Sequence, residues 1–263
     1  VRLAEHIWQR FGADGEPGVA GHPEIELALA RLAGATGDDR WRQLSKLLVD
    51  RRGTEPNWFR REAEARGEDP SNMRELSYWQ AGQPVRDAET IDGHSVRALY
   101  LLAGVEDLIA DDNSLGPACD AWWRNAIERR MYVTGGFGSN HHGEQFTEDF
   151  DLPNREAYAE TCASIAAALV ARRRLTRQPR SLDADVLERC LHNGVLAGLS
   201  LDGEHYHYAN PLTAQPGIDP HHKRPQPADA ALLQRRAWYG CACCPPNVAR
   251  LLASLGGYVA DVD

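Results

Sequence analysis

Two stretches of the sequence share one pattern: Gly21-His22-Pro23-Glu24-Ile25-Glu26-Leu27-Ala28-Leu29-Ala30 and Gly93-His94-Ser95-Val96-Arg97-Ala98-Leu99-Tyr100-Leu101-Leu102. In each, a Gly-His pair precedes an apolar stretch with helical periodicity, and the two pairs lie 72 residues apart (93 − 21). That spacing holds about two helical hairpins, and repeated hairpins are typical of an α/α toroid or solenoid. In a toroid, loops at one rim converge on a central pocket, where we expect His22 and His94. The alternative is that each histidine caps its own helix.

Helical periodicity also dominates the rest of the chain. We predict helices over residues 1–11, 23–32, 41–53, 96–109, 120–131, 156–174, 183–199 and 247–258. Only residues 132–134 and 205–208 have the composition of strands, and both segments are short. The sequence therefore predicts an all-α fold with a few short β segments.

The composition is that of an ordinary globular protein. The chain has 263 residues, of which 43% are hydrophobic, and a net charge of −9. That length allows one or two domains. An acidic balance argues against nucleic acid or an anionic membrane surface as a partner. No apolar stretch approaches the roughly 20 residues of a membrane helix. Because the chain starts at Val1 inside a helical pattern and stops at Asp263 without a cap, we expect an internal piece of a longer protein.

Clustered cysteines indicate a metal site or a catalytic site. Adjacent Cys243 and Cys244 are poorly suited to pair with each other in a disulfide, and the chain is too long for a disulfide framework. Together with Glu160 and Cys162 they supply four ligands of the kind that zinc prefers. The spacing is not that of a zinc finger, so buried inert cysteines and a redox pair both remain open as alternatives.

A glycine-rich loop precedes a candidate acid/base residue. Residues 135–143 contain four glycines, which let a backbone approach a ligand closely, and Glu144 follows directly. A loop carboxylate in this position is a plausible acid/base group. Aromatic and polar side chains suited to sugars also occur nearby in the sequence, although residues of these types more often belong to a core: Tyr132, Tyr208, Asn210, Trp238 and Tyr239.

Several stretches carry a resemblance to a known family. They are, in chain order, Tyr132-Val133-Thr134-Gly135-Gly136-Phe137-Gly138-Ser139, then Glu144, Asp151-Leu152-Pro153-Asn154, Tyr158-Ala159-Glu160-Thr161-Cys162-Ala163-Ser164, Tyr208-Ala209-Asn210-Pro211 and Cys241-Ala242-Cys243-Cys244-Pro245-Pro246-Asn247. With the two Gly-His stretches, they make nearly the whole chain resemble the β-L-arabinofuranosidase family. The Glu-Thr-Cys and Cys-Cys-Pro-Pro-Asn pair is its most specific part.

The resemblance implies a fold and a chemistry. The fold is an (α/α)6 barrel, of which residues 1–263 form an incomplete catalytic domain, with N-terminal helices and C-terminal β-sandwich domains of the family outside this chain. The activity is that of a retaining glycoside hydrolase that releases non-reducing-end β-L-arabinofuranose. By resemblance, Cys243 is the nucleophile and Glu144 the acid/base. The remaining matches are listed by role: Zn²⁺ ligands Glu160, Cys162, Cys243 and Cys244; sugar contacts His22, His94, Tyr208, Glu160 and Glu188.

The resemblance also implies a partner and leaves alternatives open. The expected substrate is an arabinose-containing oligosaccharide or glycoconjugate, and a homodimer through the domains outside this chain is compatible with it. Another pectin-type furanoside is an alternative substrate, and a non-enzymatic protein with a structural zinc site is an alternative function. Reactive zinc-bound cysteines favour a reducing compartment, which makes the cytoplasm the preferred location.

Overall fold

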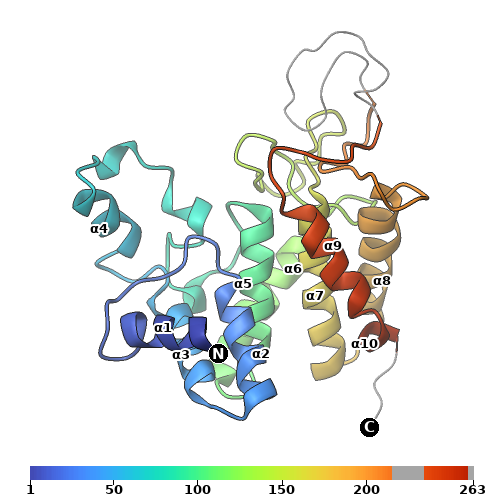
Figure 1. The fold of residues 1–263 in the computed structure, drawn as a ribbon. Coiled ribbons are helices and arrows are strands. Elements are labelled where there is room, and N and C mark those ends of the chain that lie inside the picture. The colour runs from blue at the N-terminus through green and yellow to red at the C-terminus, as the bar shows by residue number, and fades with distance from the viewer. Residues whose placement is uncertain (215–233, 260–263) are drawn as a thin grey trace. The chain divides into compact units, whose positions relative to one another are not determined.

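The computed structural model describes residues 1–214 and 234–259, and the regular structure in them is helical. The chain forms two compact units, Val1–Ala126 and Ile127–Asp263, and the division falls within one helix (Figure 1). None of the helices in the described part of the chain combines the length and the apolar character needed to cross a membrane.

The first unit contains five complete α-helices and most of a sixth among its described residues. They are α1 (Arg2–Phe11), α2 (Ile25–Thr36), α3 (Arg40–Arg51), α4 (Trp58–Ala65), α5 (Ser95–Leu108) and α6 (Gly116–Arg129). Short 3-10 turns are η1 (Pro70–Asn72), η2 (Leu76–Trp79), η3 (Val85–Asp87) and η4 (Asn113–Leu115). Helix α2 packs against both α3 and α5, so the two helices that follow the Gly-His pairs are neighbours (Figure 1).

The core of the first unit combines an apolar cluster with a buried ion pair. Its apolar part is formed by Ala4, Leu29, Ala33, Trp41, Leu44 and Leu48. Arg52 and Glu26 are fully buried and pair at 3.0 Å. Arg52 also donates to the carbonyl oxygens of Ala20 and Trp79. Because a charge removed from water must be compensated by partners, Arg52 ties the chain just before His22 to the end of α3 and to η2.

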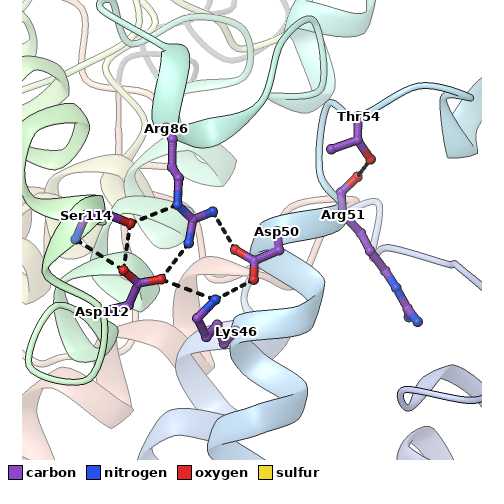
Figure 2. Close-up of polar contacts among 7 residues, drawn as sticks. All are labelled: Lys46, Asp50, Arg51, Thr54, Arg86, Asp112 and Ser114. Carbon is purple, nitrogen blue, oxygen red and sulfur yellow. Dashed lines mark hydrogen bonds and ion pairs between the residues drawn. The ribbon is translucent and has the colours of Figure 1, made fainter.

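A second ionic network joins three elements at the surface of the first unit (Figure 2). Arg86 of η3 donates to Asp50 of α3 and to Asp112, which precedes η4. Lys46 of α3 pairs with the same two carboxylates, at 2.6 and 3.2 Å. Asp112 also accepts from both the amide and the hydroxyl of Ser114. These hydrogen bonds from Ser114 and Arg86 hold the pKa of Asp112 well below its usual range.

The second unit is built around one long helix. Helix α7 (Thr161–Arg177) packs against α8 (Ser181–Arg189) and α9 (Cys244–Ala253), and α10 (Gly256–Val259) follows α9 (Figure 1). Apolar side chains from α7, α9 and the turns after α8 form a common core: Ile165, Val195, Val248 and Leu251. This core sets the distance between α7 and α9.

Helix α8 continues into a π-helical segment. The segment, η5 (Cys190–Val195), is followed by the 3-10 turn η6 (Leu196–Gly198). Gly194 lies where η5 meets α7, and a β-carbon at this position would stand 2.4 Å from Ser164 Oγ. Only a glycine therefore lets η5 approach α7 this closely. π-helical segments occur frequently at functional sites.

The observed elements confirm the predicted all-α class and correct several details. The strands predicted over residues 132–134 and 205–208 are wrong, because these residues form turns and isolated bridges. The helix predicted from residue 156 starts only at Thr161, since Ala159 has a left-handed backbone with φ of 44°. Helix α4 was not predicted, because its two apolar contacts, Phe59 and Ala63, are too few to show a period.

Two helical glycines make a matched test of the packing at η5. Replacing Gly194 by alanine is expected to lower the free energy of unfolding by about 1–3 kcal/mol, because the new methyl group collides with Ser164. Replacing Gly34 of α2, which has no atom within 4 Å of a β-carbon, is expected to raise it by about 0.5–1 kcal/mol. Urea unfolding measures both changes, and a Gly194→Ala variant at least as stable as the wild type would contradict the close approach.

The network of Figure 2 predicts a pH-dependent contribution to stability. Because the pKa of Asp112 is depressed in the folded state, its contribution is present above the unfolded value of about 3.9 and is lost as pH falls below it. Asp112→Asn keeps an acceptor for Ser114 and removes the charge, so it is expected to cost about 1 kcal/mol at neutral pH.

Urea unfolding at several pH values tests this expectation. The difference between the wild type and Asp112→Asn should shrink as pH falls from about 5 to about 3. Asp111→Asn, one residue earlier and 46% exposed in its pair with Arg42, is the control and should change little. If the difference in the free energy of unfolding between the wild type and Asp112→Asn stays constant with pH, the charge of Asp112 does not contribute to stability.

Candidate active site

Two helix N-termini meet at the candidate site. Glu160 is the N-cap residue of α7, and Cys162 lies in its first turn. Cys243 is the N-cap residue of α9, and Cys244 is its first residue, with the prolines at 245 and 246 completing the turn. The first turn tolerates proline because its amides have no helical partner. Free amides and the helix dipole favour anions at an N-terminus, so both helices stabilise negative charge on these four side chains.

The four side chains form one cluster of donor atoms. Cys162 Sγ lies 3.6 Å from Cys243 Sγ and 3.5 Å from Cys244 Sγ. The sulfurs of Cys243 and Cys244 are 3.7 Å apart. Cys243 Sγ lies 3.4 Å from Glu160 Oε1. One ligand atom from each residue lies within 4.8 Å of every other. The structure thus brings together all four predicted metal ligands.

These distances fit a tetrahedral zinc ion. With bonds of about 2.3 Å to sulfur and 2.1 Å to oxygen, the edges of the tetrahedron are about 3.8 Å between sulfurs and about 3.6 Å between sulfur and oxygen. Glu160 Oε2 is buried and has no hydrogen-bond partner among the described residues. A metal ligand would show this pattern, because a cation compensates the burial of a carboxylate oxygen. Three thiols and one carboxylate are also a donor set that selects zinc over harder ions.

The cluster concentrates negative charge on Cys243. The hydrogen bonds that Cys162 and Cys244 donate lower the pKa of the Cys243 thiol. The hydrogen bonds that Cys162 donates to Cys243 and Cys244, with burial, raise the pKa of Cys162 itself. Burial, together with the nearby negative charge of Glu144 and Cys243, raises the pKa of Glu160. Cys243 is also the only one of the four residues that is not fully buried.

Tyr208 contacts the Cys243 sulfur because its segment is pinned to the start of α7. The amide of Thr161 donates to the Tyr208 carbonyl, and the Thr161 hydroxyl donates to the His207 carbonyl. Asn210 donates from its side chain to Ala159 O and Thr161 Oγ1. These bonds leave Tyr208 Oη 3.0 Å from Cys243 Sγ. Asn210, considered for sugar binding from its residue type, therefore has a structural role.

Glu144 lies near the end of a hairpin loop and contacts a second tyrosine. Asn140 and Gln145 exchange two backbone hydrogen bonds around the loop, and Glu144 has a left-handed φ of 53°. Tyr158 Oη lies 3.0 Å from Glu144 Oε1. The rings of Tyr158 and Tyr208 are neighbours, with centroids 6.1 Å apart. Two adjacent tyrosines thus contact the candidate acid/base and the candidate nucleophile.

The glycine-rich loop is anchored to the helices behind it. Gly135 O accepts from Ser164 Oγ at 3.0 Å and from Cys190 Sγ at 3.5 Å. A β-carbon on Gly136 would stand 2.8 Å from the Ala159 side chain. The glycines therefore serve close packing against α7 and α8, which is a structural use of the flexibility expected from the sequence.

The two Gly-His pairs meet within the first unit. The rings of His22 and His94 have centroids 6.5 Å apart, and Tyr100 lies 5.7 Å from His22. His94 holds the N-cap position of α5 without a side-chain cap hydrogen bond, and the N-cap residue of α2 is Glu24. Capping is therefore not the role of either imidazole. Their predicted contacts with sugar stay predictions.

Some predicted residues have no contact with the cluster, and one contact was missed. Glu188 is exposed on α8, and its sugar-binding role stays a prediction. Cys241 is exposed and lies outside the four-ligand group, as the resemblance implies. Tyr158 was part of a quoted motif but received no role. The position of Tyr158 two residues before Glu160 was the signal in the sequence that could have suggested a role. The direction of its hydroxyl, however, depends on the left-handed turn at Ala159.

Comparison with known proteins assigns the chain to a family. A model of the β-L-arabinofuranosidase GH127 catalytic domain matches residues 1–257. A non-reducing-end β-L-arabinofuranosidase from Bifidobacterium longum subsp. longum is 45% identical over 98% of this chain. The chain covers 40% of that protein's length.

Solved structures agree with the family match. The crystal structure of a GH127 β-L-arabinofuranosidase from Geobacillus stearothermophilus T6 aligns with 100% of this chain and 42% of its own, with a TM-score of 0.91 and 43% identity. A second GH127 β-arabinofuranosidase aligns with 98% of this chain and 36% of its own, with a TM-score of 0.81 and 34% identity. Their fold confirms the predicted α/α-barrel class, and the chain belongs to the GH127 β-L-arabinofuranosidase catalytic-domain family.

Proposed function

We propose that the protein is a retaining glycoside hydrolase that releases non-reducing-end β-L-arabinofuranose from an oligosaccharide or glycoconjugate, with Cys243 as nucleophile and Glu144 as acid/base. One observation carries the proposal. A partly buried thiol within a cluster of sulfur and carboxyl donors, and a loop carboxylate, are contacted by two neighbouring tyrosines, Tyr208 and Tyr158. The identity of the sugar in this proposal is taken from the names of the relatives.

In the first step the Cys243 thiolate attacks the anomeric carbon of the bound sugar. The bond between that carbon and the leaving oxygen breaks, and Glu144 donates its proton to the leaving oxygen. The sugar is then attached to Cys243 through a carbon–sulfur bond. The cysteine takes the place that a second carboxylate holds in most retaining glycosidases.

In the second step Glu144 acts as a base. It removes a proton from a water molecule, whose oxygen attacks the anomeric carbon while the carbon–sulfur bond breaks. The electron pair returns to Cys243 as thiolate, and Glu144 regains its proton. Two inversions at the same carbon restore the starting configuration, so the enzyme retains it.

The cluster residues fit a zinc ion that would serve this chemistry. Glu160, Cys162, Cys243 and Cys244 are the residues that would hold it. Zinc bound there would keep the nucleophilic sulfur deprotonated near neutral pH and make it a better leaving group in the second step. The cysteines of the cluster are free thiols, and a reducing compartment such as the cytoplasm preserves them in that state.

A purely structural zinc site is the competing function. Structural sites are closed by four buried protein ligands. Here Glu160, Cys162 and Cys244 are at most 2% exposed, whereas Cys243 is half-buried. The one cysteine that is not fully buried and the adjacent tyrosine–Glu144 contact favour a reactive site over a closed one. The choice between β-L-arabinofuranose and another furanoside depends on measured turnover.

The nucleophile assignment predicts different effects for two cysteines of one motif. Cys243→Ser is expected to lower kcat on an aryl β-L-arabinofuranoside by about a thousandfold or more, because the attacking thiolate is lost. Cys241→Ser, at an exposed position two residues earlier, is expected to stay within a few-fold of the wild type. Release of the aryl group, followed by absorbance, measures both. Comparable activity in the two variants would refute the assignment.

The ligand assignment predicts the metal content. Second-sphere changes at metal sites cost about 10–100-fold in affinity, and loss of a direct ligand should cost at least as much. Cys162→Ala is therefore expected to lower the zinc bound per chain, measured by mass spectrometry after dialysis against a weak chelator. Cys119→Ala, a buried cysteine of α6 outside the cluster, is the control. Unchanged zinc in Cys162→Ala would show that this thiol is not a ligand.

A further inference from the structure

We propose that Tyr158 is a positioning residue for Glu144: its hydroxyl donates to Glu144 Oε1 and holds the carboxyl group in the orientation needed for proton transfer. The inference rests on the proposed function. Its geometric basis is the 3.0 Å distance between Tyr158 Oη and Glu144 Oε1. A hydrogen bond to one carboxyl oxygen limits the rotation of the carboxyl group, so it also fixes the direction of the other oxygen.

Tyr158 is a rigid anchor. Its side chain is 1% exposed. The amides of Tyr158 and Ala159 both donate to Gly138 O, at 3.1 and 3.0 Å, and Asn210 N donates to Tyr158 O. The ring also packs beside Tyr208. With its backbone and ring both fixed, the direction of the hydroxyl is fixed as well.

Glu144 needs such an anchor because of where its backbone lies. It lies in a hairpin loop whose neighbours His141 and His142 are exposed. Gly143 and Glu144 both have left-handed backbones, with φ of 84° and 53°. A left-handed glutamate is an unfavourable conformation, and such strain is typical of functional positions held by their surroundings. The loop fixes the Cα of Glu144, and the contact with Tyr158 restricts its long side chain.

The same segment fixes the cluster. Tyr158 lies two residues before Glu160, and the left-handed turn at Ala159 lies between them. The segment from Tyr158 to Glu160 therefore holds both the carboxylate of Glu144 and the donor atoms at the start of α7. A tyrosine hydroxyl carries its own proton near neutral pH, so Tyr158 can donate to Glu144 in both steps. It therefore orients Glu144 whether that residue acts as acid or as base.

The test compares two tyrosine variants on two substrates. Tyr158→Phe removes the hydroxyl that contacts Glu144. Tyr132→Phe removes another buried hydroxyl of the same unit. Tyr132, considered for sugar binding from its residue type, is a core residue that packs with Ala157 and Ala159, and its hydroxyl donates to Pro153 O, 3.1 Å away. The substrates are nitrophenyl and methyl β-L-arabinofuranoside, whose leaving groups need little and much help from an acid. kcat/KM reports the first step for each, and zinc content and circular dichroism follow the fold.

Tyr158→Phe is expected to lower kcat/KM about 10–100-fold on the methyl glycoside and only a few-fold on the nitrophenyl glycoside. Tyr132→Phe is expected to affect both equally and weakly. Equal losses on the two substrates in Tyr158→Phe, or losses matched by Tyr132→Phe, would overturn the positioning role.

Glu144→Gln separates this inference from the function on which it rests. Glu144→Gln should itself lose more on the methyl glycoside, and adding Tyr158→Phe to it should cost little more, because any purely structural effect of the tyrosine would appear in both backgrounds. A Glu144→Gln variant without leaving-group dependence would overturn the acid/base assignment. A second outcome would overturn the role of Tyr158 but keep the acid/base assignment. In it, Glu144→Gln depends on the leaving group, and adding Tyr158→Phe lowers kcat/KM by as much as it does in the wild type.

Discussion

The packing of α7 against α9 determines the site, because it brings two helix N-termini to one point. Apolar contacts of Ile165 with Val248 and Leu251 hold the helices together behind their first turns. Each N-terminus contributes one pair of donors, at positions where free amides and the helix dipole favour negative charge. Sulfur atoms 3.5–3.7 Å apart could not be held there by the loops alone. A change that tilted α9 would separate the pairs even if every donor remained.

The backbone around this point is held in conformations that the surroundings must maintain. Ala159 and Glu144 are left-handed without being glycine, and each such residue costs on the order of 1 kcal/mol or more. Opposing that cost are the hydrogen bonds from Asn210 and Ser164 and the close packing at Gly136 and Gly194, which leave no room for a β-carbon. Strain and compensation therefore occur within the same few turns, next to the candidate catalytic residues, which is the pattern expected where geometry is maintained for chemistry.

Sequence patterns predicted most of the helices and singled out the four side chains that the structure brings together, but they did not predict the segments between the helices. The helical spacing of apolar residues, with the glycines and proline at the helix ends, located α2, α3 and α5 to within a few residues, since each buries one continuous face. The four candidate ligands followed from residue type and a family motif. The paired loops that place Tyr208, Tyr158 and Glu144 were not predictable, because their conformations come from side-chain hydrogen bonds and left-handed residues rather than from a period. The same holds for Arg52, whose sequence position at the end of α3 suggests an exposed charge and whose side chain is fully buried.

The unequal burial of the four donors is what connects structure to chemistry. A site made only to stabilise a fold gains from enclosing every ligand, because water competes with each exposed one. In this cluster Glu160, Cys162 and Cys244 are fully buried, whereas Cys243 is only partly buried. A partly buried cysteine that is held by buried neighbours can exchange a partner without the cluster coming apart. The proposed role of Cys243 has this requirement, because a nucleophile must form and break a bond to carbon in every turnover.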